Sequence, residues 1–400
     1  MPAKGADLSE APGQSAHAAG RVAILGGGII GLAIGWRLAE AGAAVDIFER
    51  GTAGHGASWA AAGMLAAGVE TEPGEESLLP LARLSQELWP AFARGLEAAS
   101  GMDVGLSEAG TLVVAFARDE AEQVRFSFEL QRRQGVQLEW LARDAALELE
   151  PHLNPRLAAA YFSPGDGQVD NRLVVTALAR AFRLAGGRLH EEAPVEAIDI
   201  EAGRASGVVV AGRLHPADWV VLAAGAWSRE IAGLPEPARP PVRPVKGQML
   251  ALRMDKAAPL LRHVVWAPRA YLVPRGDGRL LVGATVEERG FEPSLTAGGL
   301  LALLDGAWRA LPALEELPIQ ETWVGFRPGS PDDAPILGPS QIPGLVLACG
   351  HHRSGILLAP ITASLIATFV LEGRLAEAIR PFAIDRFNRR SAPPADRRTA

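Results

Sequence analysis

Residues 21–49 constrain the fold of this chain more than any other segment, because a strand, a glycine-rich loop, a helix and a second strand follow one another there. An apolar run of strand character leads into residues 26–31, which read Gly-Gly-Gly-Ile-Ile-Gly, in the pattern G-x-G-x-x-G. Apolar residues then recur at helical spacing as far as Gly42, and residues 44–49 form a second strand that ends on Glu49. This succession predicts a dinucleotide-binding unit.

Each glycine of the loop has a physical role in such a unit. Gly26 permits a tight turn, and Gly28 lets backbone N–H groups approach a pyrophosphate at the positive helix N-terminus. Gly31 lets the helix pack close to the strand, and Glu49 can accept hydrogen bonds from a ribose diol. The alternative is a glycine-rich turn in some other α/β domain, but the surrounding pattern favours nucleotide binding.

Composition narrows the class of protein further. The length of 400 residues indicates two domains, or one large α/β domain with an insertion. A net charge of −7 argues against nucleic acid as the main partner. The single cysteine, Cys349, rules out an internal disulfide and fits a reducing compartment, so we expect a cytoplasmic protein and interpret Cys349 as a small buried hydrophobe.

The two ends of the chain differ from its middle. Residues 1–20 are rich in Ala, Gly, Pro and Ser without the apolar stretch of a signal peptide, and we expect a flexible tail there and another at residues 387–400. Residues 356–371 form the longest apolar stretch, which is shorter than the roughly 20 residues that a bilayer requires. We predict a buried helix for this stretch and no membrane partner.

Periodicity predicts the remaining elements. Helical patterns cover residues 78–100, 119–134, 172–185 and 298–310. Strand-like runs cover residues 111–115, 188–190, 219–223, 248–252, 271–274, 280–284 and 345–349. The helix at residues 172–185 is followed by two glycines and a strand, which indicates a βαβ crossover.

These patterns predict an α/β fold in two parts. Residues 241–325 contain short alternating strands with a Gly-Asp-Gly turn, which is typical of an antiparallel sheet. We therefore expect a discontinuous Rossmann-like dinucleotide-binding domain and an α+β substrate-binding domain built on an antiparallel sheet. The first would comprise residues 21–95, 155–240 and 326–386, and the second residues 96–154 and 241–325.

The number of dinucleotide motifs bears on the cofactor. Enzymes that pass electrons from NAD(P)H to a flavin usually carry two such folds, whereas this chain has one G-x-G-x-x-G. One early motif favours a single bound FAD and an organic electron donor, although NAD remains open on the motif alone.

Two further segments fit a flat, anionic cofactor. Residues 51–64 are almost all small, and small residues let backbone N–H groups reach phosphate or flavin oxygens; a mobile loop is the alternative. Residues 350–355 lie between an expected strand and the helix at residues 356–371. A helix that starts there would direct free N–H groups at the anion of a reduced flavin.

With these motifs in place, the chain resembles the D-amino-acid-oxidase-type FAD oxidoreductases, and most of all their glycine-oxidase branch associated with thiamine biosynthesis. The resemblance runs from residue 22 to about residue 386. Tyr-x-Val-Pro-Arg at residues 271–275 and Gly-His-x-Arg-x-Gly-Ile-Leu-Leu-Ala-Pro at residues 350–360 are its most discriminating parts. The other matching stretches are residues 26–31 with Glu49, 60–64, 244–248, 282–285 and 323–328.

The resemblance assigns residues to the site. Arg327 matches the arginine that binds the substrate carboxylate, for which its planar fork is suited. Tyr271 matches a tyrosine whose hydroxyl also holds the carboxylate, and Arg353 matches an arginine at the mouth of the site. Lys246 lies in a shared motif, where a structural role and a catalytic role are equally open. No side chain is assigned as a catalytic base, and no metal site is expected.

The cofactor contacts implied by these motifs form a larger set. They are Gly26, Gly28, Ile29, Ile30, Gly31, Glu49, Arg50, Ala57, Ser58, Ala62, Gly63, Met64, Val195, Gly225, His351, His352, Ser354, Gly355, Ile356 and Leu357.

The chain also departs from the family pattern. Arg269 stands where glycine oxidases can have a histidine, and Val286 stands in place of a methionine, so substrate preference is less determined than the fold. Ala60 occupies the position at which relatives with covalent flavin have a histidine, and Cys349 has no counterpart among their flavin-linking cysteines. We therefore expect non-covalent FAD, with His55 as the remaining candidate for a covalent link.

The resemblance implies oxidation of glycine, and of sarcosine or small D-amino acids as further candidates, to an imine with dioxygen as oxidant and hydrogen peroxide as product. The imine would supply thiazole assembly. Two alternatives stay open, namely a D-amino-acid dehydrogenase that reduces a quinone and a tRNA-modifying flavoprotein. The sequence leaves the oligomeric state open, with a homo-oligomer as one option.

Overall fold

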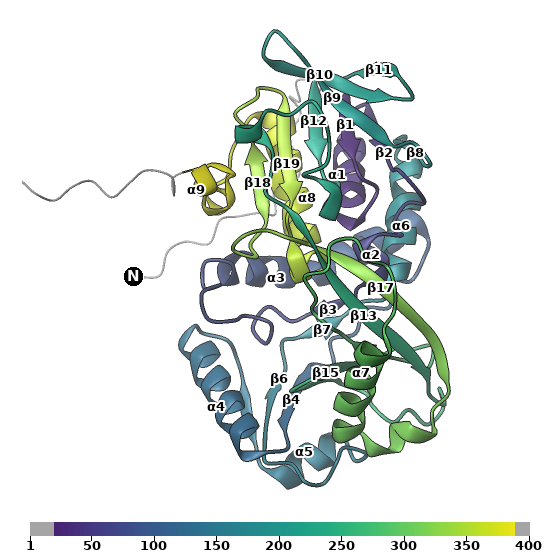
Figure 1. Ribbon diagram of the computed structural model, residues 1–400, viewed down its shortest axis with the longest axis vertical. Helices are drawn as coiled ribbons and strands as arrows, with labels where there is room; N and C mark the ends of the chain where they lie inside the picture. The colour runs from purple at the N-terminus through teal and green to yellow at the C-terminus, as the bar shows by residue number, and fades with distance from the viewer. Residues whose placement is uncertain (1–19, 389–400) are drawn as a thin grey trace, which may run out of the picture.

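The computed structural model describes residues 20–388 and assembles two large sheets from segments far apart in the chain. Figure 1 shows a mainly parallel sheet in the upper half and a mainly antiparallel sheet in the lower half, with strands β13 (Arg243–Arg253) and β17 (Ile319–Gly329) running between the halves. The tails predicted at residues 1–20 and 387–400 fall outside the described residues except for residue 20 and the end of α9 (Asp385–Asn388).

The predicted nucleotide-binding unit lies at the centre of a six-stranded sheet in the order β18-β19-β12-β1-β2-β8. All neighbours are parallel except β18 and β19. In the register of the strands, Val22 lies opposite Val45 of the strand on one side and opposite Trp219 of the strand on the other. The strands are β1 (Val22–Leu25), β2 (Val45–Phe48), β8 (Arg188–His190), β12 (Trp219–Leu222), β18 (Ile336–Pro339) and β19 (Leu345–Cys349).

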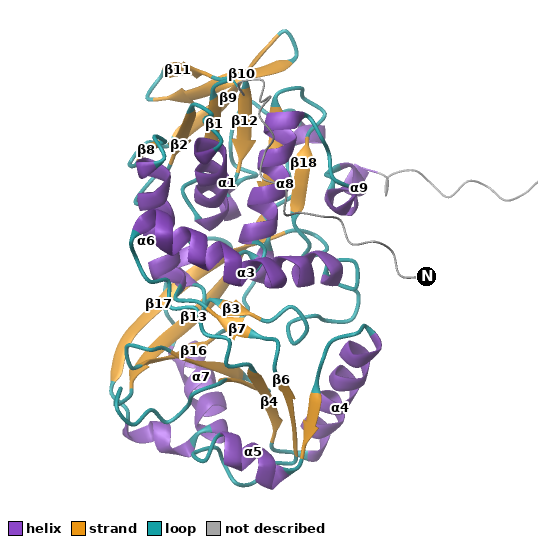
Figure 2. Ribbon diagram, turned by 180° about the vertical axis from the view of Figure 1, so that it is seen from behind, coloured by secondary structure: helices purple, strands orange, loops and turns teal. Residues whose placement is uncertain are grey.

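Both faces of this sheet are covered, as a parallel sheet requires. One face packs on helices α1 (Ile29–Glu40), α6 (Asn171–Leu184) and α8 (Ala359–Glu372), with α3 (Leu79–Ser100) against α6 and α8. Figure 2 shows α3 lying across the middle of the molecule. The opposite face packs on a three-stranded antiparallel sheet of β9 (Val195–Glu201), β10 (Arg204–Val210) and β11 (Arg213–Pro216).

The second large sheet has eight strands in the order β17-β13-β16-β15-β14-β4-β6-β5. Its neighbours are antiparallel except β14 and β4, which confirms the antiparallel sheet expected from the middle of the chain. Its remaining strands are β4 (Thr111–Ala115), β5 (Glu139–Leu141), β6 (Ala159–Ser163), β14 (Val264–Ala267), β15 (Ala270–Pro274) and β16 (Arg279–Gly283).

Helix α7 (Ala297–Ala310) packs on the outer face of this sheet through Leu303 and Ala307. Thr296 precedes the helix, and its side chain accepts a hydrogen bond from the N–H of Gly299 and so caps the helix N-terminus. The remaining elements are α2 (Ala57–Ala60), α4 (Arg118–Arg133), α5 (Arg143–Leu149), the strand pair β3 (Met64–Leu65) and β7 (Gly167–Gln168), and five 3₁₀ turns, η1 (Gly225–Trp227), η2 (Glu236–Ala238), η3 (Pro312–Glu316), η4 (His352–Ser354) and η5 (Glu377–Phe382).

The fold class predicted from sequence is confirmed, while several boundaries differ. The helix predicted at residues 356–371 begins at Ala359, and the strand predicted at residues 248–252 is more than twice as long. Strand β6 pairs with β4 and β5, and β17 continues across residue 326, so the domain boundaries predicted at residues 154/155 and 325/326 do not coincide with the division between the sheets. The division into domains stays a prediction.

Among the residues that the structure describes, no helix combines the length and the apolar character needed to cross a bilayer.

Candidate active site

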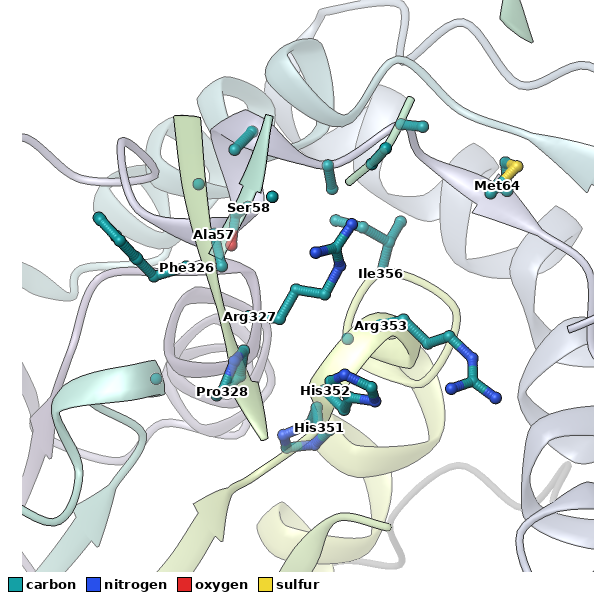
Figure 3. Close-up of a pocket in the computed structure, with 18 of the residues that line it drawn as sticks. Ala57, Ser58, Met64, Phe326, Arg327, Pro328, His351, His352, Arg353 and Ile356 are labelled. Carbon is teal, nitrogen blue, oxygen red and sulfur yellow. The ribbon is translucent and has the colours of Figure 1, made fainter. Parts of the chain in front are cut away.

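A cavity of about 1030 Å³ extends from the glycine loop of the parallel sheet to the inner face of the antiparallel sheet. Of the predicted site residues, all line this cavity except Gly31, Ser354 and Leu357. A cavity of this size and elongation can accommodate a dinucleotide together with a small substrate. Figure 3 shows part of its wall, where Ala57 and Ser58 of α2 lie near Arg327 of β17.

At the nucleotide end, backbone geometry fits a bound pyrophosphate. Gly26 has φ +105°, and a Cβ there would lie 2.4 Å from the carbonyl oxygen of Ala223, so only glycine permits this turn. Helix α1 begins at Ile29, whose N–H donates to Oγ of Ser58 at 2.9 Å. Within the described part of the chain, the N–H groups of Ile30 and Gly31 have no partner and remain available to an anion.

Glu49 directly follows β2, the position at which a nucleotide-binding unit presents an acid to a ribose. Its carboxylate accepts hydrogen bonds from the N–H of Gly27 at 2.7 Å and of Gly51 at 3.0 Å. These contacts fix the carboxylate beside the glycine loop at the edge of the cavity. The residues present therefore fit a dinucleotide cofactor.

The small residues after Glu49 follow the cavity wall closely. Arg50 lies with its guanidinium carbon 3.5 Å from the ring centroid of Trp227, and both residues line the cavity. Ala60 packs against β17, since a Cβ on Gly325 would lie 2.4 Å from the Ala60 Cβ, and its carbonyl accepts from Nε1 of Trp323 at 3.0 Å. This segment therefore packs closely along the wall of the cavity.

The segment at residues 350–355 differs from its prediction. We expected a helix to start there, but the chain forms η4 and a further turn before α8 begins at Ala359. Pro360 lies in the first turn of α8, where its missing N–H leaves no hydrogen bond unmade. Burial lowers the pKa of both His351 and His352 to about 3, so both imidazoles are neutral at physiological pH.

Tyr271 of β15 and Arg327 of β17 meet at the end of the cavity formed by the antiparallel sheet. The guanidinium of Arg327 lies against the backbone of Gly247, where a Cβ would be 2.4 Å from Nη1, and Nη1 donates to the carbonyl of Thr285 at 3.0 Å. Burial raises the pKa of the Tyr271 phenol, although nearby Arg327 lowers it, so the hydroxyl is a neutral donor. The pair can hold one carboxylate.

Arg353 lines the same cavity but is held by a different segment. One terminal nitrogen donates to the carbonyl of Glu70 at 2.8 Å and pairs with the carboxylate of Glu75. In Figure 3 its guanidinium points away from that of Arg327. A direct contact between Arg353 and substrate therefore stays a prediction.

Sequence reasoning missed Glu70 as a cavity residue. Burial raises the pKa of its carboxyl to about 7, while Arg353 lowers it. No motif contains Glu70. The only sequence feature that could have indicated a place in the cavity is that this acid follows shortly after the small residues 51–64.

Lys246 and His55 are the residues whose roles the sequence leaves open, and Cys349 is the residue interpreted from it as a small buried hydrophobe. Lys246 is fully buried, and its ammonium donates to the carbonyl of Ser294 at 2.7 Å. Cys349 is 1% exposed, and burial raises the pKa of its thiol to about 12, so it is a poor nucleophile. His55 lies exposed at the cavity edge, with its ring 4.3 Å from that of Trp59.

The family and the relatives that this chain matches are consistent with a cavity that fits a dinucleotide. Residues 21–368 match the family model described as DAO, FAD dependent oxidoreductase. The chain is 40% identical over 370 residues to the glycine oxidase of Geobacillus kaustophilus (strain HTA426), a match that covers 91% of this chain and 96% of that protein. The crystal structure of glycine oxidase from Geobacillus kaustophilus superposes with a TM-score of 0.85 at 40% identity, covering 91% of this chain and 98% of that chain.

A second kind of relative is longer than this chain. The bifunctional protein ThiO/ThiG of Synechocystis sp. (strain ATCC 27184 / PCC 6803 / Kazusa) is 39% identical over 379 residues, which cover 93% of this chain and 55% of that protein. The chain thus spans about half the length of the bifunctional relatives that it matches.

Proposed function

This chain belongs to the DAO family of FAD-dependent oxidoreductases, and from that premise we propose that it oxidises glycine to the corresponding imine, with dioxygen as the electron acceptor. The observation that carries the proposal is the pair of Arg327 and Tyr271 at one end of a cavity whose other end fits a dinucleotide. Relatives named glycine oxidase support the substrate, and those named ThiO/ThiG support delivery of the imine to thiazole assembly for thiamine.

The residues of the chain bind and orient the substrate in this proposal. Arg327 holds the carboxylate through N–H groups that its contact with Thr285 leaves unused, and the hydroxyl of Tyr271 donates to the same carboxylate. FAD, when bound, supplies the acceptor for two electrons from the substrate. The amine loses a hydride from Cα and a proton from nitrogen, and dioxygen takes up the two electrons and two protons to form hydrogen peroxide. Orientation by Arg327 and Tyr271 contributes through proximity.

Replacing Arg327 tests whether this residue binds the substrate carboxylate. Losing one partner of a buried charge-assisted pair costs roughly 2–5 kcal/mol, so Arg327→Ala should lower kcat/KM for glycine by about 30-fold to several thousand-fold. FAD content should persist, and Arg327→Lys should recover only part of the activity, because a point charge does not replace the fork. Peroxide release across glycine, sarcosine and D-amino acids measures these values. Wild-type kinetics in Arg327→Ala would remove Arg327 from the site.

We further propose that FAD is held without a covalent bond. Ala60 offers no nucleophile, and the buried thiol of Cys349 stays protonated because of its raised pKa. Acid precipitation should release all of the yellow colour into the supernatant. Flavin retained on the pellet would contradict this proposal, and the variant His55→Ala would show whether His55 is the point of attachment.

Two alternative activities are separated by direct assays. A dehydrogenase that reduces a quinone would consume substrate without matching oxygen uptake and peroxide, whereas the oxidase yields them in equal amounts. A tRNA-modifying enzyme would shift bulk tRNA in a gel, which we do not expect from a chain of net charge −7. Residence in the cytoplasm remains a prediction from the single cysteine.

A further inference from the structure

Lys246 is a buried cation on the opposite side of β13 from the substrate. Because side chains alternate along a strand, Gly247 and Met249 face the cavity, while Lys246 and Gln248 face the other way, and both of these are 0% exposed. The ammonium of Lys246 lies 2.7 Å from the carbonyl oxygen of Ser294 and 3.6 Å from Oε2 of Glu287. A charge buried this completely is costly unless it is paired, so the contacts with Ser294 and Glu287 offset the cost of burying Lys246.

Lys246 and Gln248 together hold the loop at residues 285–296 against β13. The backbone of Lys246 exchanges two hydrogen bonds with that of Glu287, at 2.9 and 3.0 Å. The side-chain amide of Gln248 donates to Oε1 of Glu287 at 2.8 Å and accepts from the N–H of Thr296 at 2.9 Å. The loop is thus fixed at both of its ends by one face of one strand.

The same loop contacts the guanidinium of Arg327. Thr285 donates its hydroxyl hydrogen to Oε1 of Glu287 at 2.6 Å, and its carbonyl oxygen accepts from Nη1 of Arg327 at 3.0 Å. Burial alone would raise the pKa of Glu287, but hydrogen bonds from Thr285 and Gln248 and the charge of Lys246 hold it below its ordinary value. Glu287 is therefore a carboxylate, able to accept from Thr285 and to pair with Lys246.

We propose that Lys246 is a positioning residue for substrate binding, which acts through Glu287 and Thr285 on the orientation of Arg327. The contact with Thr285 uses Nη1, so it determines the direction in which the other guanidinium N–H groups point. A fork that binds a carboxylate at two points depends on direction more than a point charge does. The proposal rests on the assignment of Arg327 as the carboxylate-binding residue in the proposed function.

The test compares Lys246→Met with Lys256→Met in the FAD-bound protein. Lys256 is an exposed lysine outside the cavity, so its replacement serves as the matched control. Lys246→Met should raise KM for glycine about tenfold with a smaller change in kcat, and should raise the Kd of acetate by a similar factor. Acetate binding is read from the flavin absorbance spectrum, because a carboxylate beside the flavin perturbs it. FAD content should equal that of the wild type.

Further variants test whether Lys246 acts on Arg327 through Glu287 and Thr285. Thr285→Val keeps the carbonyl that contacts Arg327 but removes the hydroxyl, and it should raise the same two constants. Adding it to Lys246→Met should change them little further, since both act along one chain of contacts. Should Lys246→Met fail to fold, Thr285→Val and Glu287→Gln carry the test, and both should weaken acetate binding.

Acetate binding also separates this proposal from the proposed activity. If the wild type binds acetate but does not oxidise glycine, the activity is wrong while the acetate constants still test Lys246. Unchanged KM and acetate Kd in folded Lys246→Met, or in both fallback variants, would overturn the positioning role. A fall in kcat alone, with both constants unchanged, would overturn it as well.

Discussion

Arg275 illustrates how a single residue joins the two halves of this molecule. Its guanidinium is buried at the end of β15, where burial lowers its pKa to about 10, which still leaves it charged at neutral pH. No carboxylate accepts directly from it among the described residues. Its acceptors, at 2.5–2.9 Å, are the carbonyls of Ala62 and Val169 and the side-chain oxygens of Gln168 and Asn171.

Replacing Arg275 should therefore affect both stability and cofactor binding. Arg275→Met leaves several buried acceptors unpaired, at about 1–3 kcal/mol each before relaxation, so we expect a loss of roughly 2–5 kcal/mol in the free energy of unfolding. FAD affinity should fall too, because Ala62 lines the cavity that we propose holds FAD. Urea unfolding and flavin fluorescence measure the two effects. Arg118→Met, at a side chain that is 95% exposed, should change neither, and an equally mild effect of Arg275→Met would refute this account.

At the scale of elements, helix α1 shows how a glycine sets the distance between a helix and a loop. A Cβ on Gly31 would lie 2.0 Å from the carbonyl oxygen of Gly26, which is backbone and has no room to move aside. A Cβ on Gly95, in the exposed face of α3, would lie 3.9 Å from the ring of Trp36, an ordinary contact. The two helical glycines thus differ in what surrounds them rather than in their own conformation.

The same substitution at these two positions should have opposite effects. Gly31→Ala should displace the start of α1 from the glycine loop and reduce FAD affinity, with a loss of thermal stability. Gly95→Ala should raise the free energy of unfolding by up to about 1 kcal/mol, because alanine favours a helix over glycine. Thermal melts with and without added FAD test both. Unimpaired FAD binding in Gly31→Ala would show that the close approach is not required.

At the scale of the whole molecule, the two sheets enclose ionisable groups that are costly to charge. Asp166, in the turn between β6 and β7, is 2% exposed, and burial raises the pKa of its carboxyl to about 7. A carboxyl whose pKa is raised in the folded state binds its proton more tightly there than in the unfolded chain. Its contribution to stability is complete below the ordinary pKa near 4 and is lost as the pH rises through 7.

Asp166→Asn should therefore stabilise the protein more at high pH than at low pH. Asparagine cannot ionise, so the free energy of unfolding of the variant, relative to the wild type, should increase between pH 5 and pH 8. Urea titrations at both values provide the comparison, with the exposed Asp119→Asn as a control. A difference between variant and wild type that does not change with pH would contradict the assignment of a buried, proton-binding carboxyl at residue 166.

The sequence by itself determined those features that depend on local pattern. The glycine loop with Glu49 predicted the parallel nucleotide-binding unit, since the pattern reports a backbone geometry that only glycine permits. The resemblance singled out Arg327 and Tyr271, and the structure places both on one cavity. Strand β17 was not predicted as a whole, because burial does not alternate along it: its first two residues are exposed, the next seven are half-buried and the last two are buried.

Only the tertiary structure decided which distant side chains share a contact. Lys246 and Ser294 are far apart in sequence, and nothing in the motif around Lys246 indicates whether its ammonium faces substrate or loop. Glu70 enters the cavity, and Arg275 binds Ala62, because strands from separate segments bring their loops together. The physical reason is that a motif reports the backbone conformation of adjacent residues, whereas burial, pairing and pKa depend on the neighbours that folding supplies.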